Sequence, residues 1–148
     1  MARVYLFGEP TPLLSVFYTV DHAVGRGCPN QRDDVALVQF LVRRVLEGWN
    51  NSLPGPPLVV DGIFGDRTRL SIEHFLRSEN KANPGSMVED GIVSPVTDRI
   101  GARSGAGKVF TMIRLNTHYS DRWGKAWHSN IAIDPACPIQ LLPSIFWR

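Results

Sequence analysis

Apolar residues recur every three or four positions in two stretches of the chain, and this spacing predicts two amphipathic helices. The first stretch follows several N-cap candidates at residues 30–34, and its apolar positions are Val35, Leu37, Val38, Leu41, Val42, Val45 and Leu46. The second stretch predicts a helix of about a dozen residues that carries Thr68, Ile72, Phe75 and Leu76. It ends at residues 83–85, where Asn-Pro-Gly stops a helix.

A nine-residue motif occurs twice, at residues 60–68 and 89–97, and both copies carry Asp-Gly-Ile with a Thr at the same later offset. The Asp of such a pair accepts a hydrogen bond within a tight turn, and the Gly adopts a positive φ without steric cost. Each copy therefore predicts a turn, an apolar plug and a helix start. A shorter third helix is expected from Pro95 past Ile100. The predicted core residues are Val35, Val38, Phe64, Ile72 and Phe75.

The stretches on either side of this helical part favour β-structure. Residues 15–20 are β-branched and aromatic, and residues 108–116 alternate apolar with polar side chains. We expect these two stretches to pair as a small antiparallel ribbon against the helices, because an isolated hairpin is only marginally stable in water. The tail is expected to be mostly extended and to pack back through Ile139, Leu141, Leu142, Ile145 and Phe146. The predicted fold class is mainly α, a three-helix bundle with a flanking ribbon formed by the N- and C-terminal extensions.

The order of these pieces resembles the small three-helix peptidoglycan-binding domain of bacterial and phage cell-wall proteins. The resemblance covers residues 30–102 and is carried by Asp34, Val35, Val38, Gln39, Val42, Asp61, Gly62, Phe64, Gly65, Thr68, Ile72, Phe75, Asp90, Gly91, Ile92, Val93, Pro95, Thr97 and Ile100. The chain departs from the family pattern in an inserted loop at residues 49–57 and at Val38, Val42, Ser71, Leu76 and Ser94. The resemblance implies one domain, residues 1–148, with a helical core at 30–102 flanked by extensions at 1–29 and 103–148.

Length and charge fit this interpretation. A chain of 148 residues can bury a stable core of its own. The net charge is +2 with dispersed basic residues, so no nucleic-acid partner is expected, although a weak attraction to anionic wall polymers is compatible with it. No apolar run approaches membrane-spanning length and residues 1–10 lack the apolar region of a secretory signal, so we expect no membrane partner. The localisation stays open, and only the resemblance implies cell wall or periplasm.

The chemistry of the chain gives no complete catalytic set. His118, Asp121, His128 and Asp134 lie in one stretch, but their spacing does not match the zinc peptidases that accompany wall-binding domains. Surface or loop histidines are the expected alternative, and we predict no metal, no cofactor and no catalytic residue. Cys28 and Cys137 are expected to be reduced, with a disulfide between the two extensions as the alternative.

The candidate ligand-binding residues lie near the inserted loop and the first Asp-Gly turn. Sugars stack on Trp rings while their hydroxyls pair with polar side chains, which singles out Trp49 and Asn50. Asp66 and Arg67 lie near a predicted helix start, where an anionic stem-peptide carboxylate can be held. The alternative is a helix start without a ligand. Trp123, Trp127 and Trp147 are more simply explained as covering the flank of the helices.

The expected function is therefore non-catalytic binding of cell-wall peptidoglycan, through its glycan or its stem peptide. The rival is a structural or adaptor protein of a phage particle or secretion apparatus, which keeps this fold and binds a protein partner. The absence of an apolar leader in the sequence favours the rival, and the intact order of the motif favours wall binding. A small hydrolase with a site assembled from the tail is a third hypothesis.

Overall fold

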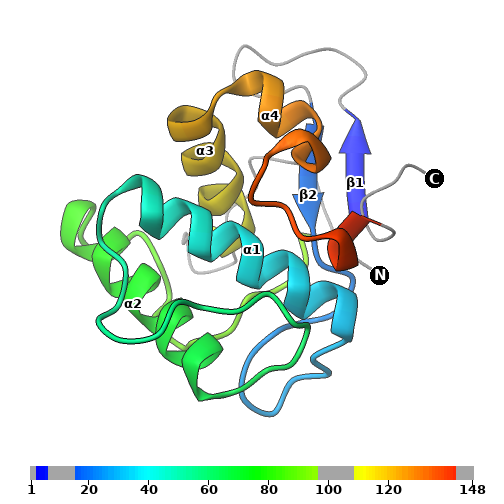
Figure 1. Ribbon diagram of the computed structural model, residues 1–148. Helices are drawn as coiled ribbons and strands as arrows, with labels where there is room; N and C mark the ends of the chain where they lie inside the picture. Colours follow the sequence, from blue (N-terminus) through cyan, green and yellow to red (C-terminus); the bar gives the residue numbers. More distant parts are fainter. Residues whose placement is uncertain (1–2, 7–15, 97–108, 143–148) are drawn as a thin grey trace.

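The computed structural model describes residues 3–6, 16–96 and 109–142, which form a mainly helical molecule (Figure 1). The helices are α1 (Arg32–Gly48), α2 (Asp66–Ala82), α3 (Thr111–Trp123) and α4 (Lys125–Ser129), followed by the short 3₁₀ helices η1 (Ile131–Ile133) and η2 (Ile139–Leu141). The strands β1 (Arg3–Leu6) and β2 (Val16–Thr19) pair antiparallel, with Arg3 opposite Thr19 and Leu6 opposite Val16. Among the described residues no helix is both long and apolar enough to cross a membrane.

Helix α1 is the centre of the fold and lies between α2 and α3 (Figure 1). Its apolar stripe is wide, so the helix buries side chains against neighbours on both sides. Three buried polar side chains on α1, those of Asp34, Gln39 and Arg44, each hold a different segment of the chain. Asp34 accepts hydrogen bonds from the backbone N–H groups of Asp21 and His22, at 2.9 and 3.0 Å, and thereby fixes the segment that enters the helix.

The predicted second helix is confirmed as α2, which is longer than expected at 17 residues and ends at Ala82, with Asn83 as its C-cap. Of the predicted core residues, Val35, Val38, Ile72 and Phe75 are buried. Phe64 is only partly buried and packs against the edge of the core. The prediction that Phe64 is a core plug is therefore confirmed only in part, because its side chain packs on the core and is not enclosed by it.

The predicted strand at residues 108–116 is wrong, because most of it belongs to helix α3. Its apolar side chains fit a strand over a few residues, but Met112, Leu115 and Tyr119 continue at helical spacing and are all fully buried. The alternation of apolar and polar residues is too short to distinguish the two-residue period of a strand from the 3.6-residue period of a helix. Asn116, on the same face, is buried and donates from Nδ2 to the carbonyl oxygens of Met112 and Tyr18, at 2.7 and 2.8 Å.

The predicted ribbon between the N- and C-terminal extensions is consequently wrong. Residues 16–19 do form a strand, but its partner is β1 from the same N-terminal extension. Helix α3 instead contacts β2 through side chains, since Asn116 Oδ1 accepts from the Tyr18 N–H at 2.9 Å. The N- and C-terminal extensions thus meet beside α1 as expected, but through a helix packed on a strand.

Two further predictions concern the later part of the chain. The predicted third helix falls mostly on residues 97–108, which lie outside the described residues, and Pro95 and Val96 have no regular structure. The tail was predicted to be extended, yet α4, η1 and η2 are short helical segments. Leu141 is buried against the core, whereas Ile139 is exposed. Ile145, Phe146 and Trp147 lie outside the described residues.

Candidate functional site

The first Asp-Gly turn is held by a side chain from α1. Asp61 Oδ1 accepts from the Ile63 N–H at 2.9 Å, and Gly62 adopts a φ of 75°, as the motif predicts. The Gln39 side-chain oxygen accepts from the N–H groups of Asp61 and Gly62, at 3.1 and 2.9 Å. Its side-chain nitrogen lies 3.0 Å from Asp61 Oδ1, from the Ile63 carbonyl oxygen and from Thr68 Oγ1. One buried amide therefore joins α1, the turn and the first turn of α2.

The second Asp-Gly turn has the same local geometry but a different support. Asp90 Oδ1 accepts from the Ile92 N–H at 3.0 Å, and Gly91 has a φ of 70°. Its support is a backbone bridge, in which Val24 and Val93 exchange two N–H to carbonyl hydrogen bonds at 3.0 and 2.8 Å. Both predicted turns are confirmed, and both are positioning elements of the scaffold.

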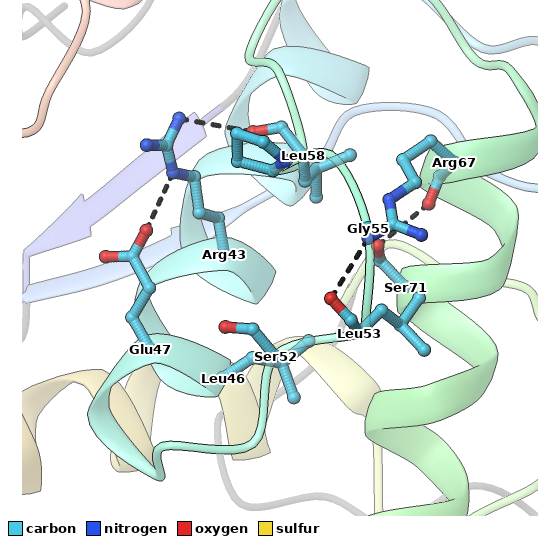
Figure 2. Close-up of a pocket in the computed structure, with 10 residues that line it drawn as sticks. Arg43, Leu46, Glu47, Ser52, Leu53, Gly55, Leu58, Arg67 and Ser71 are labelled. Atoms are coloured by element: carbon cyan, nitrogen blue, oxygen red, sulfur yellow. Dashed lines mark hydrogen bonds and ion pairs between the residues drawn. The ribbon is translucent and has the colours of Figure 1, made fainter.

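A hollow of about 160 Å³ lies between the C-terminal half of α1, the inserted loop and the start of α2 (Figure 2). We call it the loop hollow. Its lining residues are Arg43, Leu46, Glu47, Ser52, Leu53, Gly55, Pro57, Leu58, Arg67 and Ser71. Leucine side chains form much of the wall, and two guanidinium groups lie on opposite sides. Ligand pockets for whole drug-sized molecules usually measure about 300 Å³ or more, so this hollow suits one residue-sized group.

Each guanidinium group of the loop hollow also holds the inserted loop in place (Figure 2). Arg43 donates from Nη1 to the Leu58 carbonyl oxygen at 3.2 Å and from Nε to Glu47 Oε1 at 2.8 Å. Arg67 donates from Nη2 to the carbonyl oxygens of Leu53 and Pro54, at 3.1 and 2.9 Å. The Arg67 Nε is buried and makes no hydrogen bond with any described residue. The remaining N–H groups leave the hollow with an excess of donors, which suits an anionic or carbonyl group.

The four predicted ligand-binding residues are not brought together. Arg67 lines the loop hollow, but Trp49, Asn50 and Asp66 do not. Asn50 is exposed in the left-handed region, with a φ of 51°, and its N–H donates to the Glu47 carbonyl oxygen at the end of α1. The Asp66 side chain is 93% exposed and lies 3.8 Å from Arg69.

Trp49 is a packing residue of the α1–α2 edge. Its ring stacks on Phe75 with centroids 5.6 Å apart and planes at 11°, and the His118 ring meets it edge-on at 4.8 Å. With one face on a core ring, the indole is half-buried and covers the core. The geometry therefore favours a structural role for Trp49 over sugar stacking.

Sequence reasoning missed most of the residues that line the loop hollow. Arg43 and Glu47 lie four positions apart on the polar side of α1, and this spacing signals an ion pair but no ligand site. The sequence feature that could have indicated the loop hollow is the inserted loop itself. A loop that closes over a helix end has to satisfy its carbonyl oxygens, and arginines on both flanking helices do so here.

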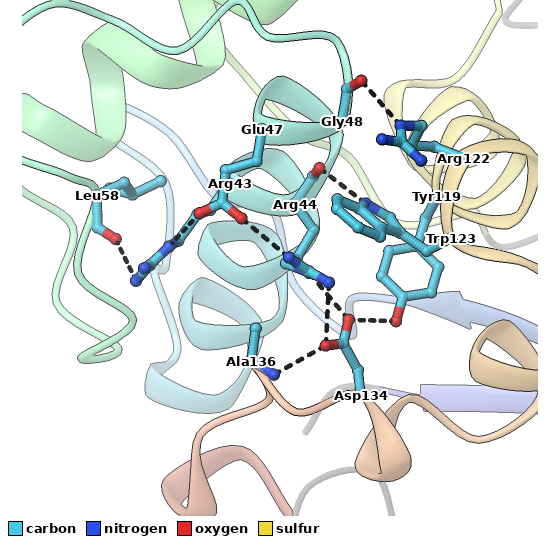
Figure 3. A network of polar contacts seen from close by, with 10 residues as sticks. All are labelled: Arg43, Arg44, Glu47, Gly48, Leu58, Tyr119, Arg122, Trp123, Asp134 and Ala136. Carbon is cyan, nitrogen blue, oxygen red and sulfur yellow. Dashed lines mark hydrogen bonds and ion pairs between the residues drawn. The ribbon is translucent and has the colours of Figure 1, made fainter.

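A buried charged cluster on the other side of α1 fixes the tail (Figure 3). Arg44 donates from Nε and Nη2 to the two carboxylate oxygens of Asp134, at 2.9 and 3.1 Å, and the Tyr119 hydroxyl donates to the same carboxylate at 2.7 Å. Burial, and then the hydrogen bond to Asp134 and its charge, raise the pKa of the Tyr119 hydroxyl, which therefore stays a donor. Trp123 covers Arg44, whose guanidinium carbon lies 3.7 Å from the ring centroid.

Glu47 connects this cluster with the loop hollow. Its Oε2 accepts from Arg44 Nη1 at 3.0 Å, while its Oε1 accepts from Arg43. The polar contacts thus run without interruption from Asp134 in the tail to Leu58, the residue that follows the inserted loop (Figure 3). The C-terminal segment consequently helps to position one wall of the loop hollow.

The histidines and acids that raised the question of a metal site are dispersed. His118 Nε2 lies 2.8 Å from Glu79 Oε2, His128 Nε2 lies 3.0 Å from Asn116 Oδ1, and Asp134 is bound to Arg44. Burial lowers the pKa of His128 to about 4, so its ring is neutral at pH 7. In the part of the chain that the structure describes, no three His, Cys, Asp or Glu side chains are grouped as metal ligands.

Glu79 is the buried acid between α2 and α3. Burial alone raises the pKa of its carboxyl, but the hydrogen bond and charge of His118, together with Arg114 at 3.5 Å, outweigh burial and lower the pKa. The carboxylate is therefore ionised and serves to join the two helices.

The two cysteines are free thiols. Burial raises the pKa of Cys137 to about 11, and burial also raises the pKa of Cys28. Neither thiol is activated as a nucleophile, because a nucleophilic cysteine needs a lowered pKa.

Comparisons of the chain with protein-family models, with curated proteins and with solved structures find no match. The geometry of the loop hollow and of the two Asp-Gly turns is therefore the basis for a functional assignment.

Proposed function

We propose that the protein binds bacterial cell-wall peptidoglycan without cleaving it, and that the loop hollow receives one residue-sized group of the glycan or stem peptide. The single observation that supports this most is the arrangement around Gln39. Residues that carry the resemblance to the peptidoglycan-binding domain, Gln39, Asp61, Gly62 and Thr68, meet in one hydrogen-bonded unit. The proposal includes the finer arrangement, in which α1, α2 and the second Asp-Gly turn form a core of that type.

The chemistry of the loop hollow fits a stem peptide better than a bare sugar. Arg43 is paired with Glu47 in the same wall, whereas Arg67 donates to carbonyl oxygens and lies beside leucine side chains. The Arg67 guanidinium and the leucines match a carboxylate next to a small apolar side chain. Sugar rings are usually bound by stacking on an exposed aromatic face. Trp49, the aromatic residue next to this loop, is instead packed on Phe75.

The proposal is tested by co-sedimentation with insoluble peptidoglycan. Ser52 lines the loop hollow and is exposed, so Ser52→Trp should fill the hollow and leave the core intact. We expect the wild type and the matched control Ser52→Ala to enter the pellet, and Ser52→Trp to stay in the supernatant. Equal sedimentation of all three proteins would exclude the loop hollow as the site. Failure of the wild type to sediment with any wall type would exclude the function.

The rival function, an adaptor that docks another protein in a phage particle or secretion apparatus, is favoured by a different observation. Val59 and Ile63 flank the first Asp-Gly turn and are 61% and 65% exposed. Exposed apolar side chains that form a patch are typical of protein interfaces. Replacing both with Ser should leave peptidoglycan sedimentation unchanged if the first proposal is right.

A further inference from the structure

A second, open hollow lies on α2, beside the first residues of the inserted loop. Its volume is about 430 Å³, and it is lined by Asn51, His74, Arg77, Ser78, Lys81 and Ala82. No residue in this set is acidic, and three can carry a positive charge. The set shares no residue with the loop hollow, so the two sites can be altered separately. We call it the α2 hollow.

The hydrogen bonds within the α2 hollow leave it with donors. His74 Nε2 lies 2.8 Å from the Asn51 carbonyl oxygen, and because a carbonyl only accepts, this nitrogen carries the hydrogen. Asn51 Nδ2 donates to Ser78 Oγ at 3.1 Å. The hydroxyl hydrogen of Ser78 is therefore available to an incoming acceptor. Asn51 consequently orients both side chains from the loop side.

The two strongest donors of the α2 hollow, Arg77 and Lys81, form no ion pair with any described residue. Arg77 and Lys81 are exposed and lie four positions apart on α2, where like charges destabilise a helix. Their side chains make no ion pair or hydrogen bond with any residue that the structure describes. Two acids on the same helix are engaged elsewhere: Glu73 by Arg69 at 3.1 Å, and the buried Glu79 by His118 at 2.8 Å. Arg77 also borders a neighbouring depression lined by three acids, Glu73, Glu89 and Asp90, and forms no ion pair with any of them.

We infer that the α2 hollow binds the phosphate group of a water-soluble, phosphate-bearing chain such as a polyol phosphate. A phosphate offers several charged acceptor oxygens, which match the planar fork of Arg77, the ammonium of Lys81 and the hydroxyl of Ser78. An open depression on a helix surface accommodates a chain that continues past the bound group. A membrane surface fits less well, because an interfacial helix binds a membrane through buried apolar area as well as charge, and the only apolar side chain in the lining is Ala82.

This inference does not rest on peptidoglycan binding, and its experiment avoids peptidoglycan. The isotope-labelled protein is titrated with inorganic phosphate and, separately, with purified poly(glycerol phosphate), while backbone amide signals are followed by NMR. We expect saturable shifts at residues 74–82 and at Asn51 in both titrations. Raising the salt concentration should weaken polymer binding, since exposed charges are screened.

The decisive comparison uses a double variant and a control of equal charge. Arg77→Gln with Lys81→Gln should weaken polymer binding roughly tenfold, because two charge-assisted contacts are lost. Arg26→Gln with Lys125→Gln removes the same net charge elsewhere and should bind within about twofold of wild type. Circular dichroism confirms that both variants are folded.

Three results would overturn the inference. The first is an absence of shifts at residues 74–82 at saturating polymer. The second is equal weakening in the two double variants, which would show a nonspecific effect of net charge. The third is binding to phosphatidylglycerol vesicles without binding to the polymer, which would assign the basic face to a membrane surface.

Discussion

The two Asp-Gly turns of this protein have the same local structure and different supports. In both, an aspartate accepts from an N–H two residues later and the glycine has a φ near 70°, at 75° for Gly62 and 70° for Gly91. The first turn is held by the buried side chain of Gln39, whereas the second is held by the backbone bridge between Val24 and Val93. Local sequence therefore determines the turn, and the surroundings determine how much stability depends on it.

The difference also concerns the proposed site. The first turn is fixed to α1 and to the start of α2, which carry the two arginines of the loop hollow. The second turn fixes the N-terminal segment near Val24. Changes at the first turn should consequently disturb both stability and the hollow, whereas changes at the second should disturb stability alone.

The largest effect is expected from Gln39→Leu. The leucine fills a similar volume but leaves the N–H groups of Asp61 and Gly62 without acceptors, and each buried unsatisfied group costs about 1–3 kcal/mol. We expect a loss of about 4 kcal/mol in the free energy of unfolding, measured by urea denaturation. Gln31→Leu is the matched control, because Gln31 is exposed and its side chain makes no cap hydrogen bond. Equal midpoints for the two variants would contradict the role of Gln39.

The next largest loss of stability is expected from alanine substitutions at the glycines of the two turns, Gly62 and Gly91. A Cβ at Gly62 would lie 2.5 Å from Arg32 Cγ and 2.8 Å from the Arg32 carbonyl oxygen, whereas a Cβ at Gly91 would meet Glu73 Cγ at an ordinary 3.6 Å. Both positions carry the left-handed backbone cost of roughly 1–2 kcal/mol for alanine. Gly62→Ala should therefore cost about 3 kcal/mol and Gly91→Ala about 1 kcal/mol. Thermal or urea unfolding that ranks them in the reverse order would refute the comparison.

The smallest effect is a pH dependence at the first turn. The hydrogen bond from the Ile63 N–H lowers the pKa of Asp61 below its ordinary value, against a smaller opposing effect of burial and with the help of Gln39. A lowered folded-state pKa gives stability that is complete above the unfolded value of about 3.9 and is lost as pH falls through the folded value. The stability difference between wild type and Asp61→Asn should shrink below about pH 4. A difference that stays constant from pH 7 to pH 3 would show that ionised Asp61 contributes nothing.

The sequence predicts those parts of the fold that depend on residues close together in the chain. Helices α1 and α2 follow from apolar spacing over four turns, and the two Asp-Gly turns follow from a side chain that bonds two residues on. The sequence predicts a strand where the structure has α3, because residues 109–115 alone fit both the strand and the helix period. The buried residue that decides between them, Tyr119, lies beyond the apparent alternation.

The parts that sequence missed depend on contacts between distant residues. Nothing near Arg44 in sequence indicates that it pairs with Asp134, ninety positions later, and that Tyr119 and Trp123 complete its enclosure. The sequence predicts a ligand-stacking role for Trp49, because a tryptophan in a loop is not expected from folding alone, but its packing partner Phe75 comes from another helix. The loop hollow likewise forms where three segments meet. Of the residues that line it, the sequence indicates only Arg67 as a ligand-binding candidate.

The most direct test of the central claim is an NMR titration of the isotope-labelled protein with soluble peptidoglycan fragments that carry an intact stem peptide. Binding in the loop hollow predicts saturable shifts of the Ser52 and Gly55 amides and of the Arg67 Nε–H, with the signals of Val59 and Ile63 unchanged. Shifts confined to Val59 and Ile63, or spectra that stay unchanged at saturating fragment concentration, would contradict peptidoglycan binding at this site.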